Sequence, residues 1–249
     1  MKKNSPISLC RRFTSRFTSR AFLSAAISLL ALTLGPGFAA NLSADELYQK
    51  FQPAKTSRVR EGIEWSNFRA NSTQDQTLPR VLLIGDSIVN GYQGKVTEKL
   101  SGKMNVSYWA TSKCVTDPDY FKELDLILGA ASYDVISFNN GLHSLSTDRA
   151  EWEEAYVQAV RFIQAKCPKS RLFLTTATPL KDPELTEKAQ ELNAILWKTA
   201  KAQNLPVIDL FSLMDPLDRN EFWSDTFHYR PAGIEMEAEK VAETVSAAQ

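Results

Sequence analysis

The stretch VLLIGDSIVNGY, residues 81–92, decides the fold class. Its four leading apolar residues are typical of a strand that is buried on both faces of a sheet, and Gly85 ends the run. Asp86 and Ser87 therefore stand at the point where a buried strand gives way to the next element. Such a polar pair can cap a helix, contact a phosphate, bind a metal or supply a nucleophile. The rest of the sequence distinguishes these roles.

Strand-like and helix-like segments alternate from residue 80 onward. The predicted strands are residues 81–84, 105–109, 134–138, 171–176 and 206–210. Three later helices are marked by their starting residues, which are Asp148, the pair Asp182 and Pro183, and Pro231. This alternation predicts one α/β domain over residues 80–249, with a parallel sheet that is covered by helices on both faces.

The first forty residues differ in composition from the rest of the chain. They contain no acidic residue and six basic ones, which are Lys2, Lys3, Arg11, Arg12, Arg16 and Arg20. An apolar run over residues 21–34 and a group of small residues around Ala39 follow, which is the order of a secretory signal. We therefore expect residues 1–40 to be a signal peptide, cut after Ala39, and the mature protein to be periplasmic or secreted. A twin-arginine signal and a mitochondrial transit peptide are the alternatives.

Residues 41–79 form an N-terminal lead-in segment before the domain. Ser43 and Glu46 have the spacing of a capping box, which predicts a short helix over residues 43–51. The remainder is polar and is expected to be irregular, with Trp65 and Phe68 as its anchors to the core.

Net charge and residue content argue against several classes of function. Loss of residues 1–40 leaves 23 basic and 29 acidic residues, which is a net charge of −6. This charge disfavours binding to nucleic acid and to anionic membrane surfaces. The chain has two histidines, no Cys-x-x-Cys pair and no glycine-rich phosphate-binding loop. We therefore expect no metal, no cofactor and no stable membrane anchor after signal cleavage.

Both histidines lie in segments that follow predicted strands. In a parallel α/β sheet, ligands bind at the carboxyl ends of the strands, where Ser87, His143 and His228 are all expected. Asp225 precedes His228 by three residues, so its carboxylate can hold one imidazole nitrogen and leave the other free as a base. Ser87 is the natural nucleophile for that base. The simpler alternatives are that Asp86 and Ser87 only cap a helix, and that His228 is an ordinary surface histidine.

Two blocks of the sequence together resemble the SGNH/GDSL hydrolases. The first is Gly85-Asp86-Ser87 after the first strand, and the last is Asp225-Thr226-Phe227-His228 before the final helix. The resemblance implies a three-layer αβα sandwich with a flavodoxin-like, five-stranded parallel sheet. It also implies a serine esterase in which Ser87 is the nucleophile, His228 the base and Asp225 the residue that orients the base. Asp86 is expected to shape the turn rather than to react.

The two middle blocks depart from the usual family pattern. The third block commonly supplies an asparagine amide to the oxyanion hole, whereas here His143 stands at that position, as in a subgroup with Asn-Gly-Leu-His. A neutral imidazole can donate one N–H, so we expect His143 and the Ser87 N–H to bind the oxyanion. The second block has no glycine, which leaves the backbone N–H of Lys113 or Cys114 as a further donor. The alternative for His143 is an ordinary loop residue.

Candidate substrate-binding residues are Asn140, Trp109 and Trp223. The two indole rings can stack on sugar faces, and their alternative is a place in the core. An exported, acidic, single-domain esterase without an apolar lid fits O-acetyl groups on carbohydrate, in a small-molecule or polysaccharide ester. The alternatives are a lysophospholipase or thioesterase for short acyl chains, an O-acyltransferase to a sugar hydroxyl, and a non-catalytic binding module on the same fold.

Overall fold

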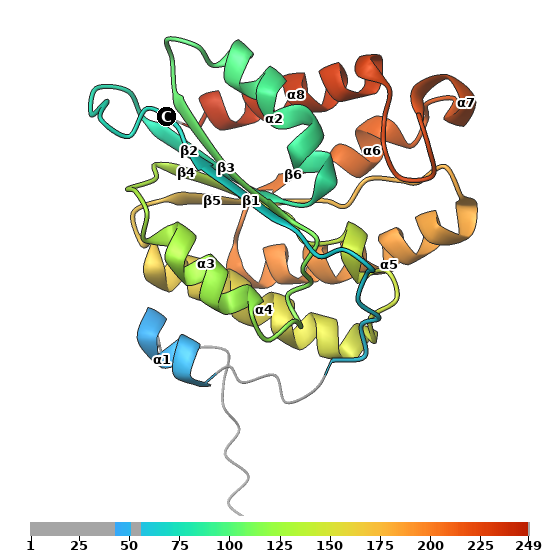
Figure 1. Cartoon of the computed structure of the whole chain (residues 1–249), viewed down its shortest axis with the longest axis horizontal. Helices are drawn as coiled ribbons and strands as arrows, with labels where there is room; N and C mark the ends of the chain where they lie inside the picture. The colour runs from blue at the N-terminus through green and yellow to red at the C-terminus, as the bar shows by residue number, and fades with distance from the viewer. Residues whose placement is uncertain (1–42, 51–55, 249) are drawn as a thin grey trace, which may run out of the picture. The chain divides into compact units, whose positions relative to one another are not determined.

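The structure is a computed structural model that describes residues 43–50 and 56–248 (Figure 1). The expected signal peptide, residues 1–40, lies outside the described residues. One sheet forms the centre of the fold, and its strands are β1 (Ser66–Ala70), β2 (Arg80–Gly85), β3 (Asn105–Thr111), β4 (Val135–Phe138), β5 (Arg171–Thr175) and β6 (Val207–Ile208). Their order across the sheet is β1-β3-β2-β4-β5-β6.

Strands β2 to β6 are parallel and correspond to the five predicted strands. Numbered among themselves along the chain, they stand in the spatial order 2-1-3-4-5, which is the flavodoxin-like order. The predicted αβα fold is confirmed. Strand β3 is added on one side of β2, and β4, β5 and β6 are added on its other side. The carboxyl end of β2 therefore lies at the switch point in strand order, where such sheets bind ligands.

Strand β1 is an addition to the predicted sheet. It lies in the lead-in segment, which we expected to be irregular, and it pairs antiparallel with β3 so that Phe68 stands opposite Trp109. This pairing covers the edge of β3, whose backbone groups would otherwise be open to another strand. None of its five residues is fully buried, so no apolar run or clear alternation marks the strand in the sequence.

Helices cover both faces of the sheet (Figure 1). One layer contains α2 (Ser87–Lys99), α6 (Leu210–Met214), α7 (Arg219–Phe222) and α8 (Pro231–Ser246), and the other contains α1 (Ala44–Lys50), α3 (Tyr120–Leu128), α4 (Arg149–Lys166) and α5 (Pro183–Gln203). Val81 and Leu83 of β2 pack in the core beneath α2 and α8, whereas Leu82 and Ile84 pack beneath α3, α4 and α5. In the part of the chain that the structure covers, no helix is both long and apolar enough to span a membrane.

The helix-start signals of the sequence act as caps in the structure. The Asp148 carboxylate accepts hydrogen bonds from the first turn of α4, and the Asp182 carboxylate does the same for α5. Ser43 and Glu46 form the predicted capping box at the start of α1. These local signals explain why the helix boundaries follow from the sequence.

Helix α8 carries one carboxyl group into the core. The Glu237 side chain is 1% exposed, and its Oε1 atom has no hydrogen-bond partner among the described residues. Burial raises the pKa of Glu237 well above its ordinary value, and the charge of Asp86 adds to the rise. Glu237 therefore keeps its proton in the folded chain under conditions where an unfolded chain loses it.

We predict that Glu237→Gln stabilises the protein at alkaline pH. Because the pKa of Glu237 is raised by folding, its contribution to stability is present at low pH and is lost as the pH rises above the ordinary glutamate range. A neutral amide removes this loss. The melting temperature should therefore rise by about 2 °C or more at pH 8 and by less at pH 4.

The control is Glu243→Gln, which changes an exposed glutamate on the same helix. It should leave the melting temperature unchanged at both pH values. A melting temperature for Glu237→Gln below that of the wild type at pH 8 would show that the buried carboxyl group does not carry this cost.

Candidate active site

Ser87 is the first residue of α2 and follows the carboxyl end of β2 after a single residue. The turn leaves no room for a side chain at Gly85, where a Cβ atom would lie 2.3 Å from Cγ2 of Val89. Asp86 caps the helix, because its carboxylate accepts the Ile88 N–H at 3.0 Å. The Ser87 N–H has no acceptor within the helix, and the positive end of the helix dipole lies at this residue.

His228 lies between Ser87 and Asp225 and contacts both, as the sequence predicted. The Nε2 atom of His228 lies 2.8 Å from Ser87 Oγ. Its Nδ1 atom lies 2.9 Å from Oδ2 and 3.1 Å from Oδ1 of Asp225. Because an ionised carboxylate can only accept, Nδ1 carries the proton and a neutral ring presents an unprotonated Nε2 to the Ser87 hydroxyl.

Backbone hydrogen bonds fix the carboxylate of Asp225. Its Oδ1 atom accepts the N–H groups of Phe227 and His228, each at 2.8 Å. Partial burial opposes the charged form, but these hydrogen bonds and the one from the His228 ring lower the pKa of Asp225 below its ordinary value. The side chains of His228 and Asp225 are 43% and 54% exposed. The carboxylate is therefore held in its charged form in a site that is open to solvent.

Trp223 and Tyr229 anchor the turn that carries Asp225 and His228. Their backbones form an antiparallel bridge, and their ring centroids are 4.5 Å apart. The Tyr229 hydroxyl and the Trp223 indole N–H both donate to the carbonyl of Pro179, at 2.8 and 3.3 Å. Pro179, in the segment after β5, thus anchors the turn from which the side chains of Asp225 and His228 reach solvent.

His143 lies in the 3-10 turn η1 (Leu142–Ser144), beside the turn that carries Ser87. The two turns are joined by a hydrogen bond of 3.2 Å from the Leu142 N–H to Oδ2 of Asp86. The Nδ1 atom of His143 contacts the carboxylate of Glu61. Its Nε2 atom is buried and has no hydrogen-bond partner in the part of the chain that the structure describes.

The contact with Glu61 corrects the expected protonation of His143. We expected a neutral ring to donate to an oxyanion. The Glu61 carboxylate accepts a hydrogen bond from Nδ1–H, so a neutral ring, with its one proton on Nδ1, has none on Nε2 and can only accept there. Donation from Nε2 therefore requires the imidazolium form, which carries a proton on each nitrogen.

The two expected backbone donors of the second block are occupied. The Lys113 N–H donates to Oγ1 of Thr111 at 3.2 Å, and the Cys114 N–H donates to Oδ2 of Asp117 at 2.8 Å. Their assignment to the oxyanion hole is therefore wrong. Polar side chains within the same loop compete for these N–H groups, and the spacing of the block does not reveal that competition.

The three expected substrate-binding side chains belong to the interior. Trp109 and Trp223 are both 0% exposed. Asn140 is 5% exposed, and its side-chain amide hydrogen-bonds to backbone groups of Lys113 and Val115. An indole without an exposed face cannot stack on a sugar, so the binding role is wrong and the alternative, a place in the core, is correct.

A small internal cavity adjoins the turn at Asp86. It is bordered by Asp86, Leu142 and Thr176, has a volume of about 10 Å³, which is room for about one water molecule, and is lined by neither Ser87 nor His228. Over residues 43–50 and 56–248, no three His, Cys, Asp or Glu side chains are grouped so that they can hold a metal ion. The groups assembled at Ser87 are thus hydrogen-bonding and acid–base groups.

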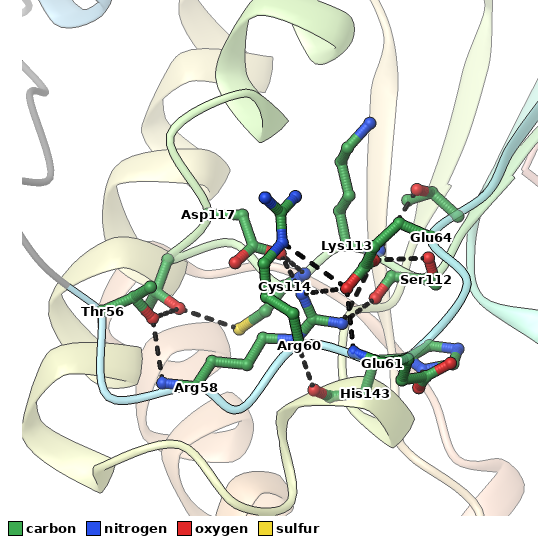
Figure 2. A network of polar contacts seen from close by, with 12 residues as sticks. Thr56, Arg58, Arg60, Glu61, Glu64, Ser112, Lys113, Cys114, Asp117 and His143 are labelled. Atoms are coloured by element: carbon green, nitrogen blue, oxygen red, sulfur yellow. Dashed lines mark hydrogen bonds and ion pairs between the residues drawn. The ribbon is translucent and has the colours of Figure 1, made fainter.

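A group of charged residues in the lead-in segment lies beside the loops of the site, although no motif in the sequence marks it (Figure 2). Arg58 is buried beneath the loops that follow β3 and β4, and Glu61 reaches His143. In the sequence, Arg58, Arg60, Glu61 and Glu64 have the composition of a solvated surface run. No spacing rule identifies which arginine of such a run is buried.

The geometry agrees with an established family of ester hydrolases. The sequence model of the GDSL-like lipase/acylhydrolase family matches residues 83–236, and the chain belongs to this family. It is an ester-hydrolysing enzyme with the SGNH hydrolase fold. No curated protein matches the sequence at a significant level.

Several solved structures share the fold. An acetyl xylan esterase is 20% identical, with 67% of this chain and 99% of that chain covered and a TM-score of 0.58. A carbohydrate esterase family 3 protein from Talaromyces cellulolyticus is 13% identical, with 68% and 96% covered and a TM-score of 0.58. A lipase/acylhydrolase from Enterococcus faecalis is 19% identical, with 68% and 96% covered and a TM-score of 0.57.

We predict that Trp109→Phe lowers stability without weakening substrate binding. The substitution removes a partly buried hydrogen bond from the indole N–H to Ser66 and leaves a void, at a cost of about 1–3 kcal/mol. The melting temperature should fall by several degrees, while the KM for a soluble ester stays within about twofold of the wild type. A tenfold rise in KM with an unchanged melting temperature would mean that Trp109 binds substrate after all.

Proposed function

We propose that the chain is an exported serine esterase that hydrolyses carboxylic esters with Ser87, His228 and Asp225. The observation that carries the proposal is the 2.8 Å contact between His228 Nε2 and Ser87 Oγ, made while Nδ1 of the same ring is held by Asp225. In this arrangement the ring can take the serine proton, and the carboxylate stabilises the imidazolium that results.

The first half of the reaction acylates the serine. Ser87 Oγ attacks the ester carbonyl carbon while His228 Nε2 removes the hydroxyl proton. The carbonyl oxygen becomes an oxyanion, which the Ser87 N–H at the start of α2 stabilises together with the Nε2 proton of His143. Collapse of the intermediate breaks the bond to the alcohol, and His228 returns its proton to the alcohol oxygen as it leaves.

The second half frees the acid. A water molecule gives a proton to His228 and attacks the acyl-enzyme, and the same oxyanion donors stabilise the second intermediate. The exposure of the His228 side chain, 43%, favours the entry of water and thus hydrolysis. Ser87 then recovers its proton from His228 as the acid is released.

We infer that short acyl groups, and O-acetyl groups on carbohydrate in particular, are the substrate. After residue 40 the sequence has no long apolar segment that could form a lid over a long acyl chain. The exposed Asp225–His228 pair leaves the site open to a bulky alcohol such as a polysaccharide. Two of the similar structures are an acetyl xylan esterase and a carbohydrate esterase family 3 protein, although their low identity supports only the fold.

Export remains part of the proposal and is supported by the sequence alone. Residues 1–40 have the charge and apolar pattern of a signal peptide, with a cut after Ala39. We propose a periplasmic or secreted enzyme, which would meet acetylated polysaccharide outside the cytoplasm. N-terminal sequencing of the mature protein from the extracytoplasmic fraction tests this point.

The experiment for the enzyme is an ester panel with the wild type and Ser87→Ala. The panel contains p-nitrophenyl acetate, butyrate and octanoate beside acetylated xylan. We predict that kcat/KM falls as the acyl chain lengthens and that acetate is released from the xylan. Loss of the nucleophile should lower kcat on p-nitrophenyl acetate by at least about 10³-fold.

Two further results complete this test. Asp225→Asn should lower kcat by less than Ser87→Ala, because it misorients His228 without removing it. An unchanged melting temperature shows that Ser87→Ala is folded. If folded Ser87→Ala cleaves the acetate ester as fast as the wild type, the nucleophile is misassigned.

A separate prediction concerns His143. The charge that it would stabilise exists only in the transition state and the tetrahedral intermediate, so its loss should lower kcat and change KM little. His143→Ala should lower kcat by about 10²- to 10³-fold, and His143→Asn should recover part of this loss through its amide. Both variants at the wild-type kcat would mean that His143 is only a loop residue.

A further inference from the structure

The lead-in segment ties together the loops on the oxyanion side of the site. The guanidinium of Arg58 is 1% exposed, and its Nη1 atom lies 2.5 Å from Oδ2 of Asp117. Its Nη2 atom donates to the Ser112 carbonyl at 2.7 Å, and its Nε donates to the His143 carbonyl at 3.2 Å. One buried side chain therefore fixes the backbone after β3 and the backbone of η1 at the same time (Figure 2).

The two acidic partners of Arg58 have pKa values that are shifted in opposite directions. Glu64 lies 3.1 Å from Nη1 of Arg58, and although burial opposes the charge, hydrogen bonds from Ser112 and Arg58 lower the pKa of Glu64. Burial raises the pKa of Asp117, against the hydrogen bond from the Cys114 N–H and the charge of Arg58. The cluster is thus a desolvated charge network, in which removal of one member leaves another without its partner.

Glu61, three residues after Arg58, acts on the side chain of the same histidine. Its carboxylate contacts Nδ1 of His143, and Trp65 packs edge-on against the ring with centroids 6.0 Å apart. These two contacts restrict the ring on one side. The other nitrogen, Nε2, is the buried atom for which the described residues supply no partner. An orphaned buried polar atom is costly unless something else, such as a substrate oxygen, meets it.

We propose that Arg58 and Glu61 are positioning residues that act on ester hydrolysis through His143. Arg58 fixes the backbone of η1. Glu61 fixes the imidazole ring by accepting a hydrogen bond from Nδ1–H, so that a second proton, on Nε2, can donate to the oxyanion. The inference rests on the proposed oxyanion role of His143. Both residues lie before residue 83, where the match to the family model begins.

A double-mutant cycle between Glu61 and His143 tests the proposal. The kinetics of p-nitrophenyl acetate hydrolysis are measured for the wild type, Glu61→Ala, His143→Ala and the double variant. We expect Glu61→Ala to lower kcat by about tenfold with little change in KM. In the absence of His143, loss of Glu61 should cost nothing more, so the double variant should have the kcat of His143→Ala.

Glu61 is suited to this test because its side chain is 46% exposed, so the substitution leaves no buried charge. The matched control is Glu235→Ala, which removes a glutamate of 48% exposure that pairs with Lys99 at the end of α2 opposite to Ser87, and it should keep the wild-type kcat. Glu61→Gln should recover part of the loss, because the amide oxygen can still accept a hydrogen bond from the Nδ1–H group of His143.

Arg58→Lys is the second variant, since a lysine cannot reach the three groups that the guanidinium fork spans. It should lower kcat more than it changes KM, and its effect should shrink when His143 is already alanine. Melting temperatures are measured beside the kinetics. If Arg58→Lys is poorly folded, the double-mutant cycle between Glu61 and His143 alone tests the positioning role.

The outcomes separate this inference from the proposed function. A slow His143→Ala together with a Glu61→Ala at the wild-type kcat overturns the positioning role and leaves the oxyanion role in place. Multiplied losses in the double variant overturn it as well, because they mean that Glu61 acts independently of His143. If His143→Ala itself keeps the wild-type kcat, the oxyanion role falls and the inference falls with it.

Discussion

The two hydrogen bonds accepted by the Asp86 carboxylate are the constraint on which the site depends. One comes from the Ile88 N–H and caps the helix that begins at Ser87, and the other comes from the Leu142 N–H and holds the turn that carries His143. A single carboxylate, that of Asp86, therefore holds both the turn of the expected nucleophile, Ser87, and the turn of the expected oxyanion donor, His143. This explains the chemical value of an aspartate between the glycine and the serine, although Asp86 itself does not react.

The site contains two imidazole–carboxylate pairs that are built in different ways. Asp225 lies three residues before His228 and is oriented by the backbone of its own turn. Glu61 comes from a segment 82 residues before His143 and depends on long-range packing. In both pairs the carboxylate meets Nδ1 and leaves Nε2 free of that carboxylate. A general base needs an unprotonated Nε2 and an oxyanion donor needs a protonated one, so the roles proposed for the two rings would require opposite states of charge.

The features that follow from local sequence rules were predictable. The parallel strands show as apolar runs because both faces of the sheet are covered, and Asp148 and Asp182 mark helix starts because caps are local. The pairing of Ser87 with His228 was predictable because each stands at the carboxyl edge of the sheet. Strand β1 could not be predicted in this way, because it is short, half exposed and without an apolar run. It is a strand because it pairs with β3, which is a long-range contact.

The features that the sequence did not predict depend on which side chains fill the core and on which groups compete for the same hydrogen bonds. Trp109 and Trp223 lie near the expected site in the sequence, but packing places both rings in the core. The N–H groups of Lys113 and Cys114 are in the expected loop, but side-chain oxygens nearby occupy them. Arg58 stands in a charged run, and only the folded chain shows which charge of the run is desolvated.

The buried arginine also bears on where the folding unit begins. The family match starts at residue 83, and a chain cut there would keep the sheet strands β3 to β6 and both helix layers except α1. It would also keep Asp117, whose side chain is 1% exposed, without the guanidinium that neutralises it. A buried carboxylate deprived of its counter-charge typically costs several kcal/mol, a large share of the stability of a domain. The lead-in segment is therefore inside the autonomous unit of folding, and a sequence boundary drawn by family likeness underestimates that unit.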